Sequence, residues 1–483
     1  LRSLSRAVRS IAVSVPSNSA TGPAASKRDA CAVPFAAKVP SRPVSEIAQT
    51  EVVNASWGER LDIFHGVVPV FLVAFIVTLL VTPLCRRFAV ANGIIDRPDE
   101  VRKNHKFPIA YLGGLAVFMG LLAAVAFSYV GPRVGLVQYH QTAKFFGEIQ
   151  SVPLSIVIGM TVIMIVGLID DVADISPWQK VGGQLFGASM LAYGEIGTKL
   201  AGQILSPVGT LLGNPDMKFV VAGVPVDVVY WVGTALIAAA VMGACNASNL
   251  IDGLDGLLSG VTAIAGIGLL VISLGLAASD DGLFDHARLV LCMALIGASL
   301  GFLPHNFNPA VIFLGDCGSL LLGYVTIVIV LSLGDTGQTS LVLAGLVIYA
   351  LPIIDTSLAI VRRKLAGKKL SEGDDQHLHH MLKRALGVKG AALAIYAMGF
   401  GFAALGVLMT LERARVSYVI VVVLASFIGV IAIKTARRKL FEEQARKLAE
   451  WESRSAALSG KPDAPGKPAP PPGRSEDPPL ATG

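Results

Sequence analysis

The chain has 483 residues, of which 53% are hydrophobic and only 15% charged, and its mean hydropathy is +0.64. Soluble proteins carry about 25% charged residues, so this composition excludes an ordinary soluble fold. The formal charge of +6 comes from basic residues spread between apolar runs, and it does not indicate a nucleic-acid partner. Five scattered cysteines without paired spacing indicate neither a disulfide framework nor a zinc site.

The two ends of the chain differ from its centre. Residues 1–60 are rich in Ser, Ala and Arg, and we interpret them as a disordered or targeting segment that need not belong to the mature protein. A translation start placed too far upstream is an equal alternative. Residues 61–434 form the predicted multi-span domain. Residues 435–483 begin basic and then become Pro-rich, which indicates a disordered cytosolic tail.

The centre of the chain is a series of long apolar runs. About 20 helical residues cross a hydrocarbon layer of about 30 Å, so we predict an all-α, polytopic membrane protein with about eleven transmembrane helices. The run at 178–196 is the weakest because it holds Lys180, Gln184 and several glycines. The predicted spans are 64–85, 108–130, 151–169, 178–196, 226–245, 257–278, 287–304, 317–334, 341–361, 389–411 and 416–434.

Basic residues indicate how the spans are oriented. They gather after the first span, as in Arg86 and Arg87, after the ninth, as in Arg362 and Arg363, and after the last. Because Lys and Arg favour the cytosolic side, this pattern predicts an N-terminus outside and a C-terminus in the cytosol. Residues 1–60 would then have to cross the membrane, which is a further reason to set them apart from the mature protein.

Five polar motifs fall at the cytosolic ends of the predicted spans. A transporter normally places its ionisable groups near the bilayer midplane. Motifs gathered at one surface favour a site that meets a soluble substrate and a lipid head group together. The motifs are "DRPDEVRKNHKFPIAYLGG" (96–114), "GLIDDVADISPWQK" (167–180), "NASNLIDGLDGL" (246–257), "HNFNPAVIFLGDCGS" (305–319) and "LPIIDTSLAIVRRK" (351–364), which leads into "DDQHLHHMLKR" (374–384).

Two of these motifs carry closely spaced acids. Asp170 and Asp171 follow an apolar run directly, and two like charges there need a compensating cation or must lose charge. Asn249, Asp252 and Asp255 recur every three residues and share a face if the segment is helical. The simpler interpretations are a helix end that marks the interface and a polar helix terminus.

The other motifs favour phosphate chemistry. Asp316 begins an apolar helix, where free amides attract phosphate and a carboxylate can hold Mg²⁺; an N-cap role is the alternative. His377, His379 and His380 lie in a basic loop without a nearby cysteine, so a phosphate clamp fits better than zinc, and solvated loop histidines are the alternative. "RKNHK" is explained equally well as a positive-inside signal. Acids for a metal and bases for phosphate together describe phosphoryl transfer onto a lipid.

At these residues the sequence resembles the polyprenyl-phosphate N-acetylhexosamine-1-phosphate transferases over residues 64–434. The motifs that carry the resemblance are the Asp-Asp after the third span, "NASNLIDGLDGL", "FLGDCGS" and "DDQHLHH", in the family order. "RKNHKFPIAYLGGLAVF" and the spaced "HLHH" look most like the bacterial undecaprenyl-phosphate N-acetylglucosamine-1-phosphate transferases. The related phospho-N-acetylmuramoyl-pentapeptide transferases typically have consecutive histidines and remain an alternative. Cys317 stands where the family more often has Thr, which puts any role of that hydroxyl in question.

The resemblance implies that undecaprenyl phosphate attacks the β-phosphorus of UDP-N-acetylglucosamine, giving lipid-linked pyrophosphoryl sugar and UMP. This reaction would begin cell-envelope polysaccharide assembly, such as lipopolysaccharide or teichoic acid. The resemblance also implies Mg²⁺ as the cofactor, with Mn²⁺ as a substitute, and an active site on the cytosolic face of the bacterial inner membrane. Relatives also imply a homodimer. Direct attack and a covalent intermediate on an Asp are both open, and we favour direct attack.

The resemblance also implies roles for individual residues. Asp316 would coordinate Mg²⁺, with Asp170 as a second ligand that also orients or deprotonates the lipid phosphate. Asp171 stands beside it, and Asp252 and Asp255 would shape the metal and nucleotide site. The implied substrate-binding residues are Asn249, Arg363, His377, His379 and His380, with His105 and Lys103 contributing more weakly at the lipid phosphate.

Two readings from other classes compete with this one. A cation or proton transporter would use Asp170, Asp171, Asp252 and Asp255, and it needs them near the midplane and reachable from both sides. A structural scaffold or flippase partner explains the topology but not the clustered Asp, His and Gly.

Overall fold

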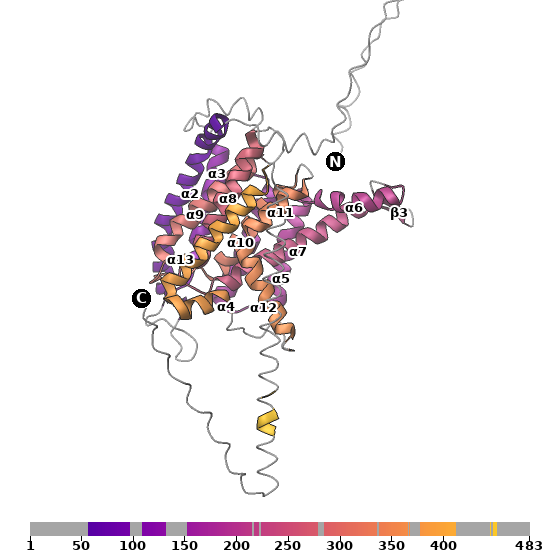
Figure 1. The fold of residues 1–483 in the computed structure, drawn as a ribbon. Helices are drawn as coiled ribbons and strands as arrows, with labels where there is room; N and C mark the ends of the chain where they lie inside the picture. The colour runs from indigo at the N-terminus through magenta and orange to yellow at the C-terminus, as the bar shows by residue number, and fades with distance from the viewer. Residues whose placement is uncertain are drawn as a thin grey trace, which may run out of the picture. The chain divides into compact units, whose positions relative to one another are not determined.

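The protein is described by a computed structural model. The residues that it describes are 57–96, 109–131, 152–214, 217–221, 224–278, 285–335, 338–365, 367, 377–411, 445 and 448–451. Within these ranges the fold is helical apart from two small antiparallel hairpins, in which β1 pairs with β2 and β3 with β4 (Figure 1). The predicted span at 416–434, the predicted N-terminal segment up to residue 56 and most of the predicted tail lie outside the described residues.

The elements follow one another as a chain of helices of very different lengths. In order they are α2 (Trp57–Ala91), β1 (Ile95–Asp96), β2 (Ile109–Ala110), α3 (Gly113–Val130), α4 (Leu154–Ala173), α5 (Pro177–Tyr193), α6 (Leu200–Leu211), β3 (Lys218–Val221), β4 (Val224–Asp227), α7 (Val228–Ile251), α8 (Leu257–Ala278), α9 (Asp285–Asn306), α10 (Gly315–Ser332), α11 (Thr339–Ile348), α12 (Ala350–Leu365) and α13 (Leu378–Leu408).

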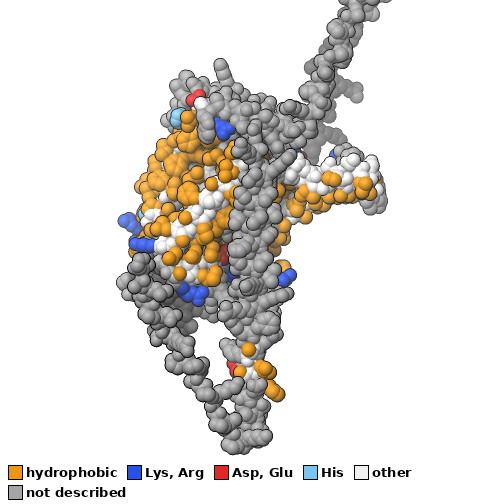
Figure 2. Space-filling view, in the orientation of Figure 1, with side chains coloured by type: hydrophobic (Ala, Val, Ile, Leu, Met, Phe, Trp, Pro, Cys, Tyr) orange, Lys and Arg blue, Asp and Glu red, His pale blue; other side chains and the backbone are white. Residues whose placement is uncertain are grey.

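Eight described helices are long and apolar enough to cross a membrane: α2, α3, α4, α7, α8, α9, α10 and α13. The bent pair α11 and α12 gives a ninth span if it is counted as one. These nine match nine of the predicted apolar runs. Helix α5, which corresponds to the run at 178–196, has 17 residues and is not among the candidate spans. Figure 2 shows apolar side chains over much of the flank of the bundle, as expected for a surface in contact with lipid.

Two of the predicted spans are interrupted in ways that the apolar pattern did not predict. The run at 341–361 bends by 78° between α11 and α12. Pro352 lies in the first turn of α12 and cannot donate to the carbonyl of Ile348, which disfavours a continuous helix there. Helix α13 begins at Leu378 rather than near residue 389, and it is kinked at Gly387, whose φ is 73°. The histidine motif therefore opens this helical element.

Helix α10 is enclosed by the rest of the bundle. Its side chains from Cys317 to Ser332 are buried, because α3, α4, α7, α8 and α9 all pack against it. Glycines bring three of these neighbours very close: a Cβ on Gly114 of α3, on Gly167 of α4 or on Gly323 of α10 itself would collide with backbone atoms across the contact. A helix that is apolar all round and packs through small residues is typical of the centre of a membrane bundle.

The N-terminus of α10 is held by residues from two distant parts of the chain. The Asp171 carboxylate accepts hydrogen bonds from the backbone N–H groups of Asp316 (2.7 Å) and Cys317 (3.0 Å). Gly315 has a φ of +73°, and a Cβ there would lie 2.4 Å from Asp171 Oδ2, so the turn requires glycine. Gly114 donates to the carbonyl of Leu314 at 2.8 Å, which ties the start of α3 to the same place.

We expect Gly114→Ala to destabilise the protein by about 1–3 kcal/mol, because the added methyl group would lie 2.1 Å from the backbone N of Gly318 and would push α3 away from α10. Gly243→Ala is the matched control, since nothing lies within 4 Å of a Cβ at that helical position. Thermal unfolding of the purified protein in detergent measures both. Equal melting temperatures would contradict the close packing described above.

Candidate active site

One lysine joins two of the predicted acids. The Nζ atom of Lys180 lies 2.6 Å from Asp170 Oδ2 and 2.6 Å from Asp316 Oδ2. Lys180 lies in the first turn of α5, which begins at a capping box formed by Ser176 and Gln179. The cap turns the chain back at the end of α4, so Lys180 meets the carboxylate of Asp170 in the last turn of α4 and that of Asp316 in the first turn of α10.

Asn249 brings α7 to the same carboxylate. Its Nδ2 donates to Asp316 Oδ1 at 2.8 Å and to the Ser319 hydroxyl at 3.0 Å. Both oxygens of Asp316 therefore have a donor, one from Lys180 and one from Asn249. The structure thus joins two of the predicted site residues, Asn249 and Asp316, by a direct hydrogen bond.

Two of the predicted catalytic acids are occupied by contacts that hold the backbone. Asp171 caps α10, as described above. Asp255 accepts from the Asn308 side-chain amide (2.7 Å) and from the backbone N–H of Ala310 (3.2 Å), and so fixes the segment between α9 and α10. Both carboxylates therefore hold the backbone around the site; the resemblance implies a place beside Asp170 for Asp171 and a share in shaping the metal and nucleotide site for Asp255.

Asp252 differs from the other acids. It ends α7, is half-buried, and forms no hydrogen bond or ion pair with any residue in the described ranges. Burial raises the pKa of Asp252 to about 8, and the negative charges of Asp316 and Asp171 add to the shift. A carboxylate in this setting carries its charge readily only beside a cation. Oxygen ligands of this kind suit Mg²⁺, so Asp252 and the neighbouring Asp316 fit a divalent ion.

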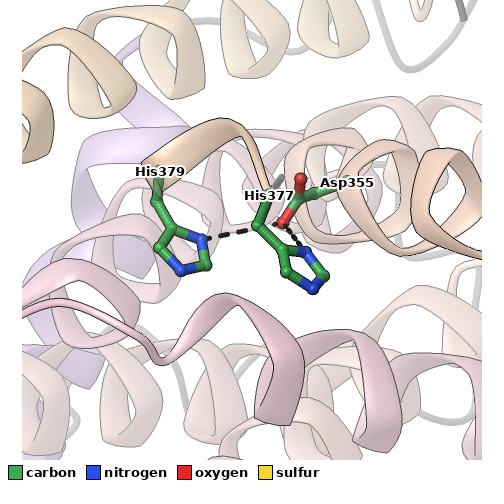
Figure 3. A group of neighbouring side chains, drawn as sticks. All are labelled: Asp355, His377 and His379. Atoms are coloured by element: carbon green, nitrogen blue, oxygen red, sulfur yellow. Dashed lines mark hydrogen bonds and ion pairs between the residues drawn. The ribbon is translucent and has the colours of Figure 1, made fainter. Parts of the chain in front are cut away.

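A second group contains histidines and an acid that are all buried (Figure 3). Asp355 Oδ2 lies 2.9 Å from His377 Nδ1, and Oδ1 accepts the backbone N–H of Leu378 at 2.9 Å. His379 stacks on His377, and its Nδ1 lies 3.8 Å from Asp355 Oδ2. One ligand atom from each of Asp355, His377 and His379 lies within 4.8 Å of the others, a spacing that can hold a metal ion or present imidazoles to a phosphate.

The histidine group adjoins the acidic group. A Cβ on Gly253 would lie 2.3 Å from His379 Nε2, so this ring lies against the backbone directly after Asp252. His380 follows, with its ring centroid 4.2 Å from that of His379. Residues from α4, α5, α7, α10, α12 and α13 are therefore joined in one continuous site at the same end of the bundle.

Some predicted residues are not part of these contacts. Lys103 and His105 lie outside the described residues. Arg363 is half-buried and follows Asp355 by eight residues, about two turns along α12.

Two residues of the site were missed from the sequence. The sequence pattern assigns no role to Lys180, which only weakens an apolar run, or to Asp355, which lies within one of the motifs. The available signal in each case was an ionisable residue within a largely apolar run, which is costly unless it has a partner.

Comparison with known proteins agrees with the motifs. The model of glycosyl transferase family 4 matches residues 153–334, from the start of α4 to the end of α10. A probable undecaprenyl-phosphate N-acetylglucosaminyl 1-phosphate transferase of Bacillus subtilis (strain 168) is 31% identical over 368 residues, which cover 76% of this chain and 91% of the relative.

Two further relatives extend the comparison. A decaprenyl-phosphate N-acetylglucosaminephosphotransferase of Mycolicibacterium smegmatis is 31% identical over 70% of this chain and 81% of its own. An undecaprenyl-phosphate alpha-N-acetylglucosaminyl 1-phosphate transferase of Escherichia coli (strain K12) is 30% identical over 64% of this chain and 75% of its own. The resemblance predicted from the motifs is confirmed: the chain belongs to the polyprenyl-phosphate sugar-1-phosphate transferases of glycosyl transferase family 4.

Proposed function

We propose that this enzyme transfers N-acetylglucosamine 1-phosphate from UDP-N-acetylglucosamine to undecaprenyl phosphate, releases UMP, and so begins the assembly of an envelope polysaccharide. The observation that carries the proposal is the joined site, in which Lys180 bridges Asp170 and Asp316 beside Asp252, which has no hydrogen-bond or ion-pair partner among the described residues. The three relatives described above share N-acetylglucosamine in their names but differ between undecaprenyl and decaprenyl phosphate. The sugar is therefore better supported than the length of the lipid.

Transfer between two phosphates depends on positioning and on neutralising negative charge. Asp316 and Asp252 would hold Mg²⁺, with Asp170 as a further oxygen ligand, because Lys180 lies between Asp170 and Asp316, and Asp316 is close enough to Asp252 to raise its pKa. When bound, the ion would neutralise charge on the donor's pyrophosphate.

The protein's own groups would handle the two substrates from opposite sides of the acidic group. Lys180, held by Asp170, can exchange one carboxylate for the incoming lipid phosphate and orient it for direct attack. On the other side, Asp355 fixes the ring of His377 through Nδ1, which leaves Nε2 for the donor's phosphates together with His379 and His380. Asp171 and Asp255 would keep the backbone of the site in place.

The site would face the cytosol of a bacterial cell, in its inner membrane. The support is the basic last turn of α12, Arg362 to Lys364, at the end of the bundle that carries the site. The acids lie in the terminal turns of α4 and α10 and at the end of α7, a placement that does not favour a transporter with a site near the midplane.

The substrate assignment is tested in vesicles containing the purified enzyme and undecaprenyl phosphate. We expect radiolabelled lipid-linked sugar from UDP-N-acetylglucosamine at a rate at least tenfold above that from UDP-N-acetylgalactosamine or UDP-N-acetylmuramoyl-pentapeptide. Replacing undecaprenyl by decaprenyl phosphate in a parallel reaction compares the lipids. A higher rate with either competing nucleotide would overturn the sugar assignment.

Lys180→Met should lower the rate of lipid-linked sugar formation by about 10²-fold or more, because it removes the cation that stands between Asp170 and Asp316. Lys199→Met is the matched control. Lys199 also pairs with an aspartate 136 residues further on, Asp335 at 3.1 Å, but at the other end of α10. Loss of activity in both variants to the same degree would indicate a structural role for Lys180.

Adding Mg²⁺ should raise the melting temperature of the purified enzyme, because an ion that binds only the folded state stabilises it. Asp252→Asn should keep the metal-free melting temperature, since no described residue hydrogen-bonds to its carboxylate, and should reduce the Mg²⁺-dependent shift by more than half. Differential scanning fluorimetry in detergent, with EDTA as the reference, measures both quantities. An undiminished shift in the variant would remove Asp252 from the metal site.

A further inference from the structure

The histidine group has the donor atoms of a transition-metal site. Asp355 lies in α12, whereas His377 and His379 lie at the start of α13, so two helices contribute to the group (Figure 3). All three residues are buried, Asp355 and His379 at 2% exposure and His377 at 5%. One ligand atom from each lies within 4.8 Å of the others. Two imidazoles and one carboxylate therefore meet in the same small volume, away from water.

The distances within the group are close to those that an ion requires. Ligands about 2.0–2.2 Å from a tetrahedral zinc ion lie about 3.3 Å from one another. Asp355 Oδ2 lies 2.9 Å from His377 Nδ1 and 3.8 Å from His379 Nδ1, one value below that separation and one above it. Small rotations of the two rings would thus bring the three atoms to coordination distance.

His379 is the member of the group whose contacts are incomplete. Its Nδ1 is buried and has no hydrogen-bond partner among the described residues. Buried polar atoms nearly always have a partner in folded proteins, so this nitrogen indicates a missing one. Nε2 of the same ring faces Gly253, where a Cβ would lie 2.3 Å away, while Nδ1 faces Asp355. An ion between Asp355 and His379 would supply the partner.

The backbone orients the carboxylate. Asp355 Oδ1 accepts the backbone N–H of Leu378 at 2.9 Å, which leaves Oδ2 for the two rings. Hydrogen bonds of this kind hold metal-binding carboxylates in place, because they fix one oxygen and aim the other. The histidine motif alone contains no carboxylate ligand. Asp355, which precedes His377 by 22 residues, supplies it from another motif.

The ligand types select the ion. Mg²⁺ prefers six oxygen ligands, so a group with two imidazole nitrogens is a poor magnesium site. Zn²⁺ binds imidazole and carboxylate together, and two His with one carboxylate and an open fourth position is one of its regular arrangements. The acidic group around Asp316 differs, because its carboxylates offer only oxygen.

We propose that Asp355, His377 and His379 form a binding site for a zinc-type transition-metal ion, separate from the acidic group. Asp355 Oδ2 and the Nδ1 atoms of both histidines hold the ion, and its fourth position is open to water. The ion replaces the hydrogen bond between Asp355 and His377 and fastens the first turn of α13 to α12. Since it takes only the Nδ1 atoms, both Nε2 atoms remain for the role proposed above. The inference concerns metal binding and stands independently of the proposed reaction.

The test uses Co²⁺ as a spectroscopic substitute for Zn²⁺. Cobalt in a four-coordinate site with nitrogen ligands absorbs visible light strongly, whereas cobalt in a six-coordinate oxygen site absorbs weakly. The full-length enzyme, purified without a histidine tag and stripped of metal with EDTA that is then removed, is titrated with Co²⁺ in the presence of excess Mg²⁺. We expect strong visible bands that saturate at one ion per chain and disappear when Zn²⁺ is added.

His379→Ala and Asp355→Asn should each weaken Co²⁺ binding by about tenfold or more, because each removes one ligand. Asp355→Asn keeps an oxygen that can accept from Leu378, and His379→Gln is a second variant in case His379→Ala does not fold. The controls are Asp316→Asn, in the acidic group, and His65→Ala, at an exposed histidine of α2. Both should leave the visible bands unchanged.

The absence of strong visible bands from the unsubstituted enzyme would overturn the proposal. It would also be overturned if the bands persisted undiminished in the His379 variants and were lost in Asp316→Asn, because the ion would then lie in the acidic group.

Discussion

The site depends on how a bundle of apolar helices tolerates several carboxylates at one end of α10. In a surrounding of low polarity, each negative charge must have a donor, a counter-ion or a proton. Lys180 serves two of them at once, since its ammonium group lies 2.6 Å from both Asp170 and Asp316. Backbone N–H groups serve Asp171, and an amide with a backbone N–H serves Asp255. Asp252 has no such partner among the described residues, and burial, with the negative charges of Asp316 and Asp171 adding to it, raises its pKa.

This distribution separates two kinds of acid that look alike in the sequence. Asp171 and Asp255 have the contacts of residues that fix a helix start and a loop, so they determine where the remaining groups stand. Asp170 and Asp316 share the ammonium group of Lys180, and Asp252 has no partner among the described residues, so these are the groups that an approaching phosphate and its metal would meet. In each of the pairs Asp170–Asp171 and Asp252–Asp255, one acid thus holds the backbone and the other is available for chemistry. The hydrogen-bond partners, from segments 53 to 146 residues away, decide which is which.

Much of the helical framework could be predicted from the sequence, because a run of apolar residues is a local signal. The structure also brings together Asp170, Asn249 and Asp316 from three of the motifs, since Lys180 joins the two acids and Asn249 hydrogen-bonds to Asp316. The bend between α11 and α12 was not predicted, because apolar composition does not show whether a helix is straight or bent. Pro352 is the sequence feature at the break. Lys180 and Asp355 were missed because their roles arise from contacts with residues distant in the chain. Neither the spacing nor the type of the neighbouring residues indicates such a contact.

Helix α5 connects the contacts at the start of α10 with those beyond its C-terminal end. Its apolar pattern is weak, but its small and polar side chains face protein: Gly183 packs on Val166, and Gln184 is buried and accepts from the Asn246 amide of α7 at 3.0 Å. Because this face of α5 packs on protein, apolar side chains are needed only on the other face, where Leu185 and Phe186 are 41% and 43% exposed. Lys180 pins its first turn to the start of α10, and Lys199, six residues after its end, pins the chain to Asp335 beyond the end of α10. The contacts of α5 and α10 therefore set the position of the acidic group at one end of α10 and of the Lys199–Asp335 pair at the other.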